Sequence, residues 1–212
     1  MRVLPPLEAH RLWAPVYDST PNPLLALERR SVAPLMPGLA GLRVLDVAAG
    51  TGRWARYMKS RGAAVVSVDL CGSMILQAPA PSVIADAACL PFPGQWADLV
   101  LCAFAFDYMP PCLDELSRVT RTGGHVVVSD MHPEAAAHGW TRSFRSGDEV
   151  IAIQARGGTL ADLHHPALRM TNLIEASFGE PERPYFIQAG KPAAFEDARA
   201  IPAIYVARWV KR

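Results

Sequence analysis

Short apolar runs alternate with amphipathic ones over the first 130 residues of the chain. The apolar runs predict buried strands at Arg43–Val47, Ala64–Asp69, Ser82–Ala85, Ala97–Cys102 and His125–Ser129. The segments between them predict helices at Arg53–Arg61, Gly72–Gln77 and Cys112–Thr120. Strands that alternate with helices in this way indicate βαβ units and a parallel sheet covered on both faces. The pattern therefore predicts a doubly wound α/β fold.

The two ends of the chain are patterned differently. Amphipathic spacing predicts two helices before the first strand, from Leu7 to Tyr17 and from Leu24 to Met36. Beyond Asp130 the pattern loosens. The expected elements there are a hairpin at Phe144–Ala155, a helix at Pro166–Phe178 and strands at Pro184–Gln188 and Ala203–Val210. We expect this last third to extend the same sheet within one domain, residues 1–212, because no repeat or composition break divides the chain.

The composition excludes several classes of protein. Half of the 212 residues are hydrophobic and 19% are charged, which is typical of a globular domain. The formal net charge of +1 provides no broad electrostatic surface for nucleic acid or an anionic membrane. The amino end has no secretory signal, no apolar stretch is long enough to cross a bilayer, and the four cysteines form no Cys-x-x-Cys pair. We expect a reduced, cytoplasmic protein.

The most informative segment follows the first predicted strand of the sheet. Between Val44 and Ala55 the chain changes from strand to a loop of small residues, and then to helix. Small residues allow the backbone to approach a ligand closely, and a helix start presents free amide groups. The segment predicts a cofactor site, although a tight strand-to-helix turn also uses glycine for backbone reasons alone.

Acidic residues narrow the class of cofactor. Asp69 closes the second strand of the sheet, where doubly wound folds place a carboxylate that accepts hydrogen bonds from ribose hydroxyls. Asp46, at the loop entrance, would repel a pyrophosphate, and Ala55 replaces the third glycine of the dinucleotide motif. No Gly-Lys-Ser or Gly-Lys-Thr follows, which excludes a P-loop. The Asp46 carboxylate is compatible with a nucleoside ligand that carries a positively charged ammonium or sulfonium group.

These motifs resemble the class I S-adenosylmethionine-dependent methyltransferases. The matching motifs are Val44–Ala55, Val65–Met74, Ile84–Phe92, Ala97–Leu101 and Leu116–Gly124. The resemblance implies a mostly parallel seven-stranded sheet of the Rossmann-like methyltransferase fold. It also implies a helical lid at residues 1–41, a cofactor-binding half at 42–130, and acceptor-side elements with closing strands at 131–212. The similarity is to the small-molecule subgroup that includes ubiquinone- and biotin-pathway enzymes.

The resemblance further implies S-adenosyl-L-methionine as cofactor, with S-adenosyl-L-homocysteine as product. The expected cofactor contacts are Tyr17, Asp46, Ala48, Ala49, Gly50, Gly52, Asp69, Leu70, Met74, Asp86, Ala87, Cys102, Ala103 and Phe104. Asp46 and the loop lie on the methionyl side in this family, Asp69 holds the ribose and Asp86 takes the adenine amino group. The chain departs from the family in having Ala48 and Ala49 where glycine is frequent.

The acceptor side is less defined. The Asp-Pro-Pro-Tyr box of the branch that methylates nucleobases and glutamine is absent after the fourth strand of the sheet, so an aromatic-lined pocket is expected instead. Its expected catalytic residues are His132, Asp107 and Tyr108, with His132 preferred as the base, and its substrate-binding residues are Phe106, Trp140, Arg142 and His164. His132 has an alternative role as a turn cap. No metal site is expected, because the side chains of the adjacent His164 and His165 point in different directions.

The function expected from the resemblance is methyl transfer to an O, N or C atom of a small organic molecule by in-line displacement. The alternative is a non-catalytic S-adenosylmethionine-binding protein that acts as a regulator or partner subunit. A nucleic-acid or protein methyltransferase lacks support from charge or from an added recognition domain. We expect a small-molecule partner, no nucleic acid or membrane partner, and a monomer or homodimer.

Overall fold

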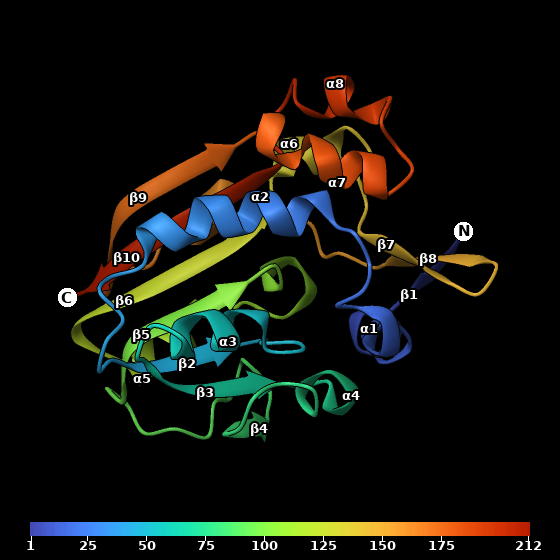
Figure 1. Cartoon of the computed structure of the whole chain (residues 1–212). Coiled ribbons are helices and arrows are strands. Elements are labelled where there is room, and N and C mark those ends of the chain that lie inside the picture. Colours follow the sequence, from blue (N-terminus) through green and yellow to red (C-terminus); the bar gives the residue numbers. More distant parts are fainter.

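A seven-stranded sheet forms the centre of the computed structural model, which describes all 212 residues (Figure 1). Its strands, in spatial order, are β4 (Ser82–Ile84), β3 (Ala64–Asp69), β2 (Arg43–Val47), β5 (Ala97–Ala103), β6 (Thr120–Met131), β10 (Ile204–Lys211) and β9 (Leu168–Ala176). Strands β2 to β6 are parallel, and β10 is antiparallel to both of its neighbours. The predicted doubly wound, mostly parallel seven-stranded fold is confirmed.

Helices cover both faces of this sheet because its central strands are apolar on both sides. In the view of Figure 1, α2 (Pro23–Val32) and α3 (Arg53–Lys59) lie in front of the sheet. They bury Leu27, Trp54 and Met58 in one core. Helix α5 (Leu113–Val119) contributes to a second core with β5, β6 and β10. α4 (Gly72–Ile75) follows β3, as predicted. No helix has the length and apolarity that a bilayer crossing requires.

The predicted hairpin forms, but in a separate sheet. Strands β7 (Ser143–Ser146) and β8 (Glu149–Ile153) pair antiparallel, and β1 (Arg2–Leu4) joins β8. Helix α1 (Pro6–Trp13) and the 3-10 turn η1 (Ala14–Val16) pack on this small sheet, where the Trp13 and Phe144 rings stack with centroids 4.8 Å apart. The sequence did not predict β1, because three residues before two prolines carry no periodic signal.

Two predicted elements are wrong. Residues 168–176 are an edge strand, β9, and not part of a helix, because they pair along their whole length with β10. Residues 183–188 are helix α7 (Arg183–Gln188) and not a strand, with a proline in the first turn and Phe186 packed edge-on against Phe195 of α8 (Ala194–Ala198). The remaining elements are α6 (Pro133–Ala137) and the 3-10 turns η2 (Ala33–Leu35), η3 (Phe106–Tyr108), η4 (Leu160–Leu163) and η5 (Glu180–Glu182).

A buried carboxylate joins three of these elements. Glu28 of α2 has no exposed surface. It accepts hydrogen bonds from Arg53 Nη2 at 2.6 Å and from Trp54 Nε1 at 3.0 Å, both at the start of α3. It also accepts from Ser129 Oγ of β6 at 2.9 Å. The amino-terminal helix is thereby fixed to the helix that follows the small-residue loop.

Replacing Glu28 by Ala leaves the buried donors of Trp54 and Ser129, and the partly exposed guanidinium of Arg53, without their acceptor. We expect the free energy of unfolding to fall by about 3 to 5 kcal/mol, the usual cost of breaking a buried ion pair from one side. Urea unfolding followed by circular dichroism measures this. The matched control is Glu8→Ala, which removes an exposed ion pair with Arg2 and costs at most about 1 kcal/mol. Equal losses in the two variants would contradict the assigned role of Glu28.

Candidate functional site

The cavity that gathers most of the predicted cofactor residues, called the main cavity below, opens at the carboxyl ends of β2, β3 and β5, where parallel α/β sheets bind their ligands. Most residues expected at the site from the sequence line it. They are Tyr17, Asp46, Ala48, Ala49, Gly50, Asp69, Leu70, Met74, Asp86, Ala87, Ala103, Phe104, Tyr108 and Arg142. Pro6, Leu7 and His10 of α1, with Tyr17 directly after η1, form a further part of the wall.

Asp69 organises the small-residue loop of this cavity. Its Oδ2 accepts from the backbone N–H of Gly50 at 2.7 Å, and its Oδ1 accepts from that of Cys71 at 2.7 Å. Burial raises the pKa of this carboxyl, while the backbone donors oppose the rise. One carboxylate therefore joins the loop after β2 to the loop after β3, with oxygen lone pairs still free for a ligand.

Gly52 has a packing role in the same loop and does not line the cavity. Its φ of +80° suits glycine, and a Cβ there would lie 2.6 Å from Pro79 Cδ and 2.8 Å from Ala78 Cβ. Gly50 also has a positive φ, but its missing Cβ faces open space. The loop therefore needs one glycine for close packing and presents the other to the cavity.

Asp46 is the most unusual group in the cavity. The side chain is 1% exposed, and Oδ2 has no hydrogen-bond partner. Burial raises the pKa of this carboxyl to about 7, although Arg53 and the backbone N–H of Ala55 oppose the shift. An unpartnered carboxylate oxygen at this depth is costly, and it identifies a position where a cationic or hydrogen-bond-donating ligand would gain affinity.

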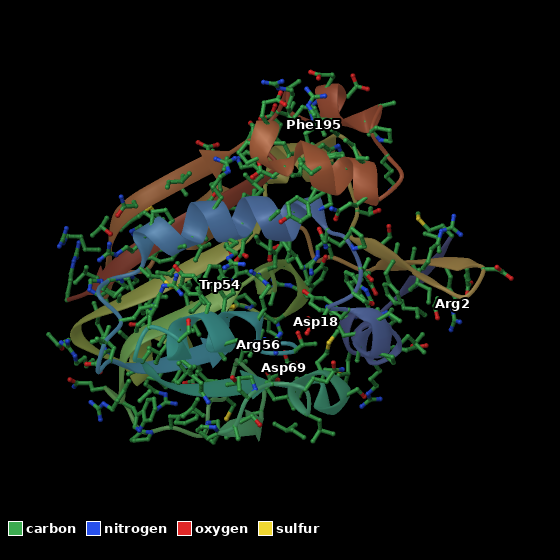
Figure 2. All side chains as sticks on the ribbon, in the orientation of Figure 1. Arg2, Asp18, Trp54, Arg56, Asp69 and Phe195 are labelled. Atoms are coloured by element: carbon green, nitrogen blue, oxygen red, sulfur yellow. The ribbon has the colours of Figure 1, made fainter.

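The segment after α1 is fastened to this loop by Asp18 (Figure 2). Its carboxylate accepts from Thr51 Oγ1 at 2.6 Å and from Arg56 Nη2 at 3.0 Å. The neighbouring Tyr17 packs edge-on against Trp13 with ring centroids 4.7 Å apart, and it lines the cavity. The amino-terminal helices therefore close one side of the cavity.

Arg142 lies on another wall of the cavity. Its side chain is almost fully buried, and Nη1 donates to the carbonyl of Phe104 at 2.5 Å. The guanidinium carbon lies 4.9 Å from the ring centroids of both Phe104 and Tyr108. Burial raises the pKa of Tyr108, although Arg142 opposes the shift. Tyr108 is therefore a neutral hydroxyl at physiological pH.

The structure does not bring His132 into the main cavity. Its Nδ1 accepts from the backbone N–H of Glu134 at 3.1 Å, which makes it the N-cap of α6, and Nε2 donates to Glu175 Oε2 at 2.8 Å. Both ring nitrogens are occupied by structural partners. The capping role, and not that of a base, agrees with this geometry.

Other predicted site residues also lie elsewhere. Phe106, Asp107 and His164 line a different cavity, near Arg156. Trp140 lines a third cavity with Phe178 and Phe186. Cys102 is fully buried within the sheet. The expected acceptor residues therefore separate into different regions of the surface, and only Tyr108 and Arg142 join the cofactor residues.

His10 lines the main cavity and was missed by sequence reasoning. Its Nδ1 donates to the carbonyl of Pro6 at 2.7 Å, which fixes the tautomer and leaves the Nε2 lone pair without a protein donor. Burial, and secondarily Arg142, lowers the pKa of His10 to about 4. Its ring meets Tyr108 edge-on with centroids 5.8 Å apart. No motif surrounds His10, so only tertiary packing reveals it.

The chain is similar in sequence to known methyltransferases. A family profile described as a methyltransferase domain matches residues 45–128. The chain is 32% identical over 105 residues to a malonyl-[acyl-carrier protein] O-methyltransferase of Pectobacterium atrosepticum, an alignment of 46% of this chain and 42% of that protein. It is 35% identical over 127 residues to a demethylmenaquinone methyltransferase of Beutenbergia cavernae, covering 54% of this chain and 52% of that protein. The chain spans about half the length of the curated relatives it matches.

Solved structures share the fold across nearly the whole chain. An S-adenosylmethionine-dependent methyltransferase from Mesorhizobium loti superposes with a TM-score of 0.66 at 20% identity, covering 90% of this chain and all of that one. A possible histamine N-methyltransferase from Thermotoga maritima gives a TM-score of 0.69 at 16% identity, covering 97% and 99%. At these identities the likeness establishes the fold.

The raised pKa of Asp46 predicts a pH dependence of stability. The unfolded value is about 3.9, so ionisation of Asp46 between pH 4 and about 7 lowers the stability of the folded state. Asp46→Asn removes this titration. We expect the free energy of unfolding of the variant, relative to wild type, to increase by about 2 kcal/mol between pH 5 and pH 8.

Urea unfolding at the two pH values measures this difference. Asp130, whose pKa burial raises to about 6, titrates in both proteins and cancels in the comparison. Asp148→Asn, at an exposed turn between β7 and β8, is the control and should show the same difference from wild type at both pH values. A difference for Asp46→Asn that does not change with pH would refute the burial argument.

Proposed function

Residues 45–128 belong to the S-adenosylmethionine-dependent methyltransferases, as the sequence motifs indicated, and we propose that this chain methylates a small organic molecule. The observation that carries the proposal is the cavity where Asp69 holds the small-residue loop and Asp46 presents an unpartnered oxygen. The relatives' names support a small methyl-accepting group, because one specifies demethylmenaquinone and the other a malonyl group carried on acyl-carrier protein. The cavity supports the identity of the cofactor, and the identity of the methyl acceptor has to be argued from other residues.

The residues of the main cavity fit the cofactor. The buried, unpartnered Oδ2 of Asp46 suits the positively charged methionyl end. Asp69 retains acceptor capacity for ribose hydroxyls, and Asp86, which is exposed, lies in the cavity wall for the adenine amino group. Leu70 and Met74 supply apolar surface for the adenine ring. Tyr17 closes the side of the cavity formed by the amino-terminal helices.

When bound, S-adenosylmethionine supplies an electrophilic methyl group on a sulfonium. The residues of the chain position the acceptor in line with that methyl group and exclude water. Positioning and exclusion of water account for most of the rate acceleration in such displacements. Asp18 ties the segment after α1 to the small-residue loop through Thr51 and to α3 through Arg56. An O–H or N–H acceptor also loses a proton, for which the Nε2 lone pair of His10 is available in the cavity.

Label transfer tests the proposal against non-catalytic binding. The protein is incubated with S-adenosylmethionine labelled on the methyl group and with fractionated small molecules from cells that produce it. We expect label in at least one small-molecule fraction, and a calorimetric titration with S-adenosylhomocysteine to give saturable binding. Binding without any transfer would favour the regulatory or partner role, and absence of binding would refute both.

Asp69→Ala removes the carboxylate that joins Gly50 and Cys71. We expect the dissociation constant for S-adenosylhomocysteine to rise at least tenfold, because the variant loses both the ribose acceptor and the anchor of the loop. Isothermal titration calorimetry measures this, with Asp148→Ala as a control outside the cavity. An unchanged constant for Asp69→Ala would remove this residue from the proposed site.

His10→Asn tests the proton-accepting role. We expect the transfer rate to an O–H or N–H acceptor to fall at least tenfold, since general bases contribute about a hundredfold or more, while the affinity for S-adenosylhomocysteine stays within twofold. His138→Asn is a matched control, because His138 also bonds through Nδ1 to a carbonyl four residues earlier, but on the exposed surface. A rate equal to that of the control would assign His10 a packing role only.

A further inference from the structure

The buried guanidinium of Arg142 makes no ion pair. The residue is 6% exposed, and its one short hydrogen bond goes to the neutral carbonyl of Phe104. The aromatic faces of Phe104 and Tyr108 give it favourable quadrupole contacts. These contacts are weaker than a carboxylate partner, so the cation is only partly compensated for its loss of water.

The neighbouring acid, Asp130, makes no direct ion pair with Arg142. Asp130 acts on the guanidinium through space, but its two oxygens accept backbone N–H groups from Asp107 at 2.8 Å and Met131 at 2.7 Å. Burial also raises the pKa of Asp130 to about 6, so part of the population is protonated in mildly acidic solution. The position beside Arg142 therefore favours an additional anion.

Arg142 also occupies a special place among the cavities. It is the one residue that lines both the main cavity and the third cavity, to which Trp140, Phe178 and Phe186 contribute. In the main cavity its guanidinium lies beside the Tyr108 ring, which the His10 ring meets edge-on. The guanidinium thus lies against aromatic rings at the point where the two cavities meet.

Resting on the proposed methyl transfer, we propose that the acceptor is a small apolar carboxylic acid whose carboxylate pairs with Arg142. The planar guanidinium suits a carboxylate, and the rings of Phe104 and Tyr108 suit an apolar body beside it. The carboxylate of the cofactor is the competing partner. A second cation, Arg53, lines the same cavity at the start of α3, although its Nη2 already pairs with Glu28.

An anion at Arg142 would also affect His10. Arg142 contributes to the lowered pKa of His10, so a carboxylate that neutralises the guanidinium favours protonation of the imidazole. Binding of an acidic acceptor would therefore strengthen His10 as a proton acceptor. The two residues thus act on the same ligand, one holding its carboxylate and the other receiving a proton.

The test uses protein saturated with S-adenosylhomocysteine and three pairs of probes, namely benzoate, cinnamate and 3-phenylpropanoate with their neutral amides. We expect wild type to bind at least one acid tenfold more tightly than its amide by calorimetry. Arg142→Met should abolish this preference and leave the affinity for S-adenosylhomocysteine within twofold. Arg145→Met, which changes an exposed arginine on β7 three positions away, should retain the preference.

Arg142→Lys keeps the charge and protects the test against misfolding of Arg142→Met. We expect Arg142→Lys to retain a reduced preference for the acid over its amide. Thermal melting of wild type with and without each probe gives a second measure of binding that needs no variant. Equal binding of every acid and amide, or a preference that survives in Arg142→Met, would overturn the proposal.

The affinity of Arg142→Met for S-adenosylhomocysteine shows whether Arg142 pairs with the carboxylate of the acceptor or with that of the cofactor. If Arg142→Met weakens S-adenosylhomocysteine tenfold but binds 5′-methylthioadenosine normally, Arg142 pairs with the cofactor carboxylate and the proposal is overturned. If wild type binds no S-adenosylhomocysteine at all, the proposed function fails, and this inference fails with it.

Discussion

The buried carboxylate of Glu28 is the interaction on which the rest of the site depends. A carboxylate with no exposed surface is stable only when donors surround it, and Arg53, Trp54 and Ser129 provide them. Arg53 and Trp54 are the first residues of α3, directly after the small-residue loop. Holding them fixes where that loop ends, so the amino-terminal helices and the cofactor-facing loop form one packed unit. Asp18 adds a second attachment on the exposed side through Arg56.

The carboxyl edge of the sheet then combines fixed geometry with unbalanced charge. Asp69 is satisfied by backbone donors, whereas Asp46 keeps a bare oxygen. On another wall, the guanidinium of Arg142 has no direct ion-pair partner, and its short hydrogen bond goes to a carbonyl. A protein selected for stability alone would fill such positions with paired or apolar groups. The unpaired charges of opposite sign instead suit a site whose ligands supply the missing partners. The buried cluster around Glu28 contributes to the stability of the fold.

The predictable part of the molecule is the part encoded locally. Strands β2 to β6 and the loop between β2 and α3 follow from short-range periodicity and small-residue patterning, which neighbouring residues determine. The two wrong elements lie where long-range pairing decides. Residues 168–176 have a spacing that also suits a helix, but the free edge of β10 recruits them as β9. The aromatic run in α7 has strand propensity, but Phe186 is buried by packing against Phe178 and Phe195.

The same division runs through the candidate site. Apart from Tyr17, the expected cofactor residues lie in short motifs at the ends of the strands β2 to β5, and most of them meet in the cavity. The proposed acceptor wall is assembled from α1, η3 and the residue before β7, which lie far apart in the chain. Trp140 and Arg142 differ by two positions, yet Trp140 joins only the apolar cavity. Sequence reasoning therefore chose His132, beside a recognisable strand end, over His10, which only folding brings to the cavity.

This separation has a consequence for how such a chain changes specificity. The cofactor loop is fixed by Glu28 and Asp69, neither of which contributes to the wall around Arg142. Substitutions in α1 or before β7 can therefore reshape the acceptor side while the loop keeps its anchors. The constraint on the acceptor side is electrostatic, because any replacement there must still accommodate the buried cation. A new acceptor is then most readily gained if it retains an anionic group, since that change leaves the charge of Arg142 compensated.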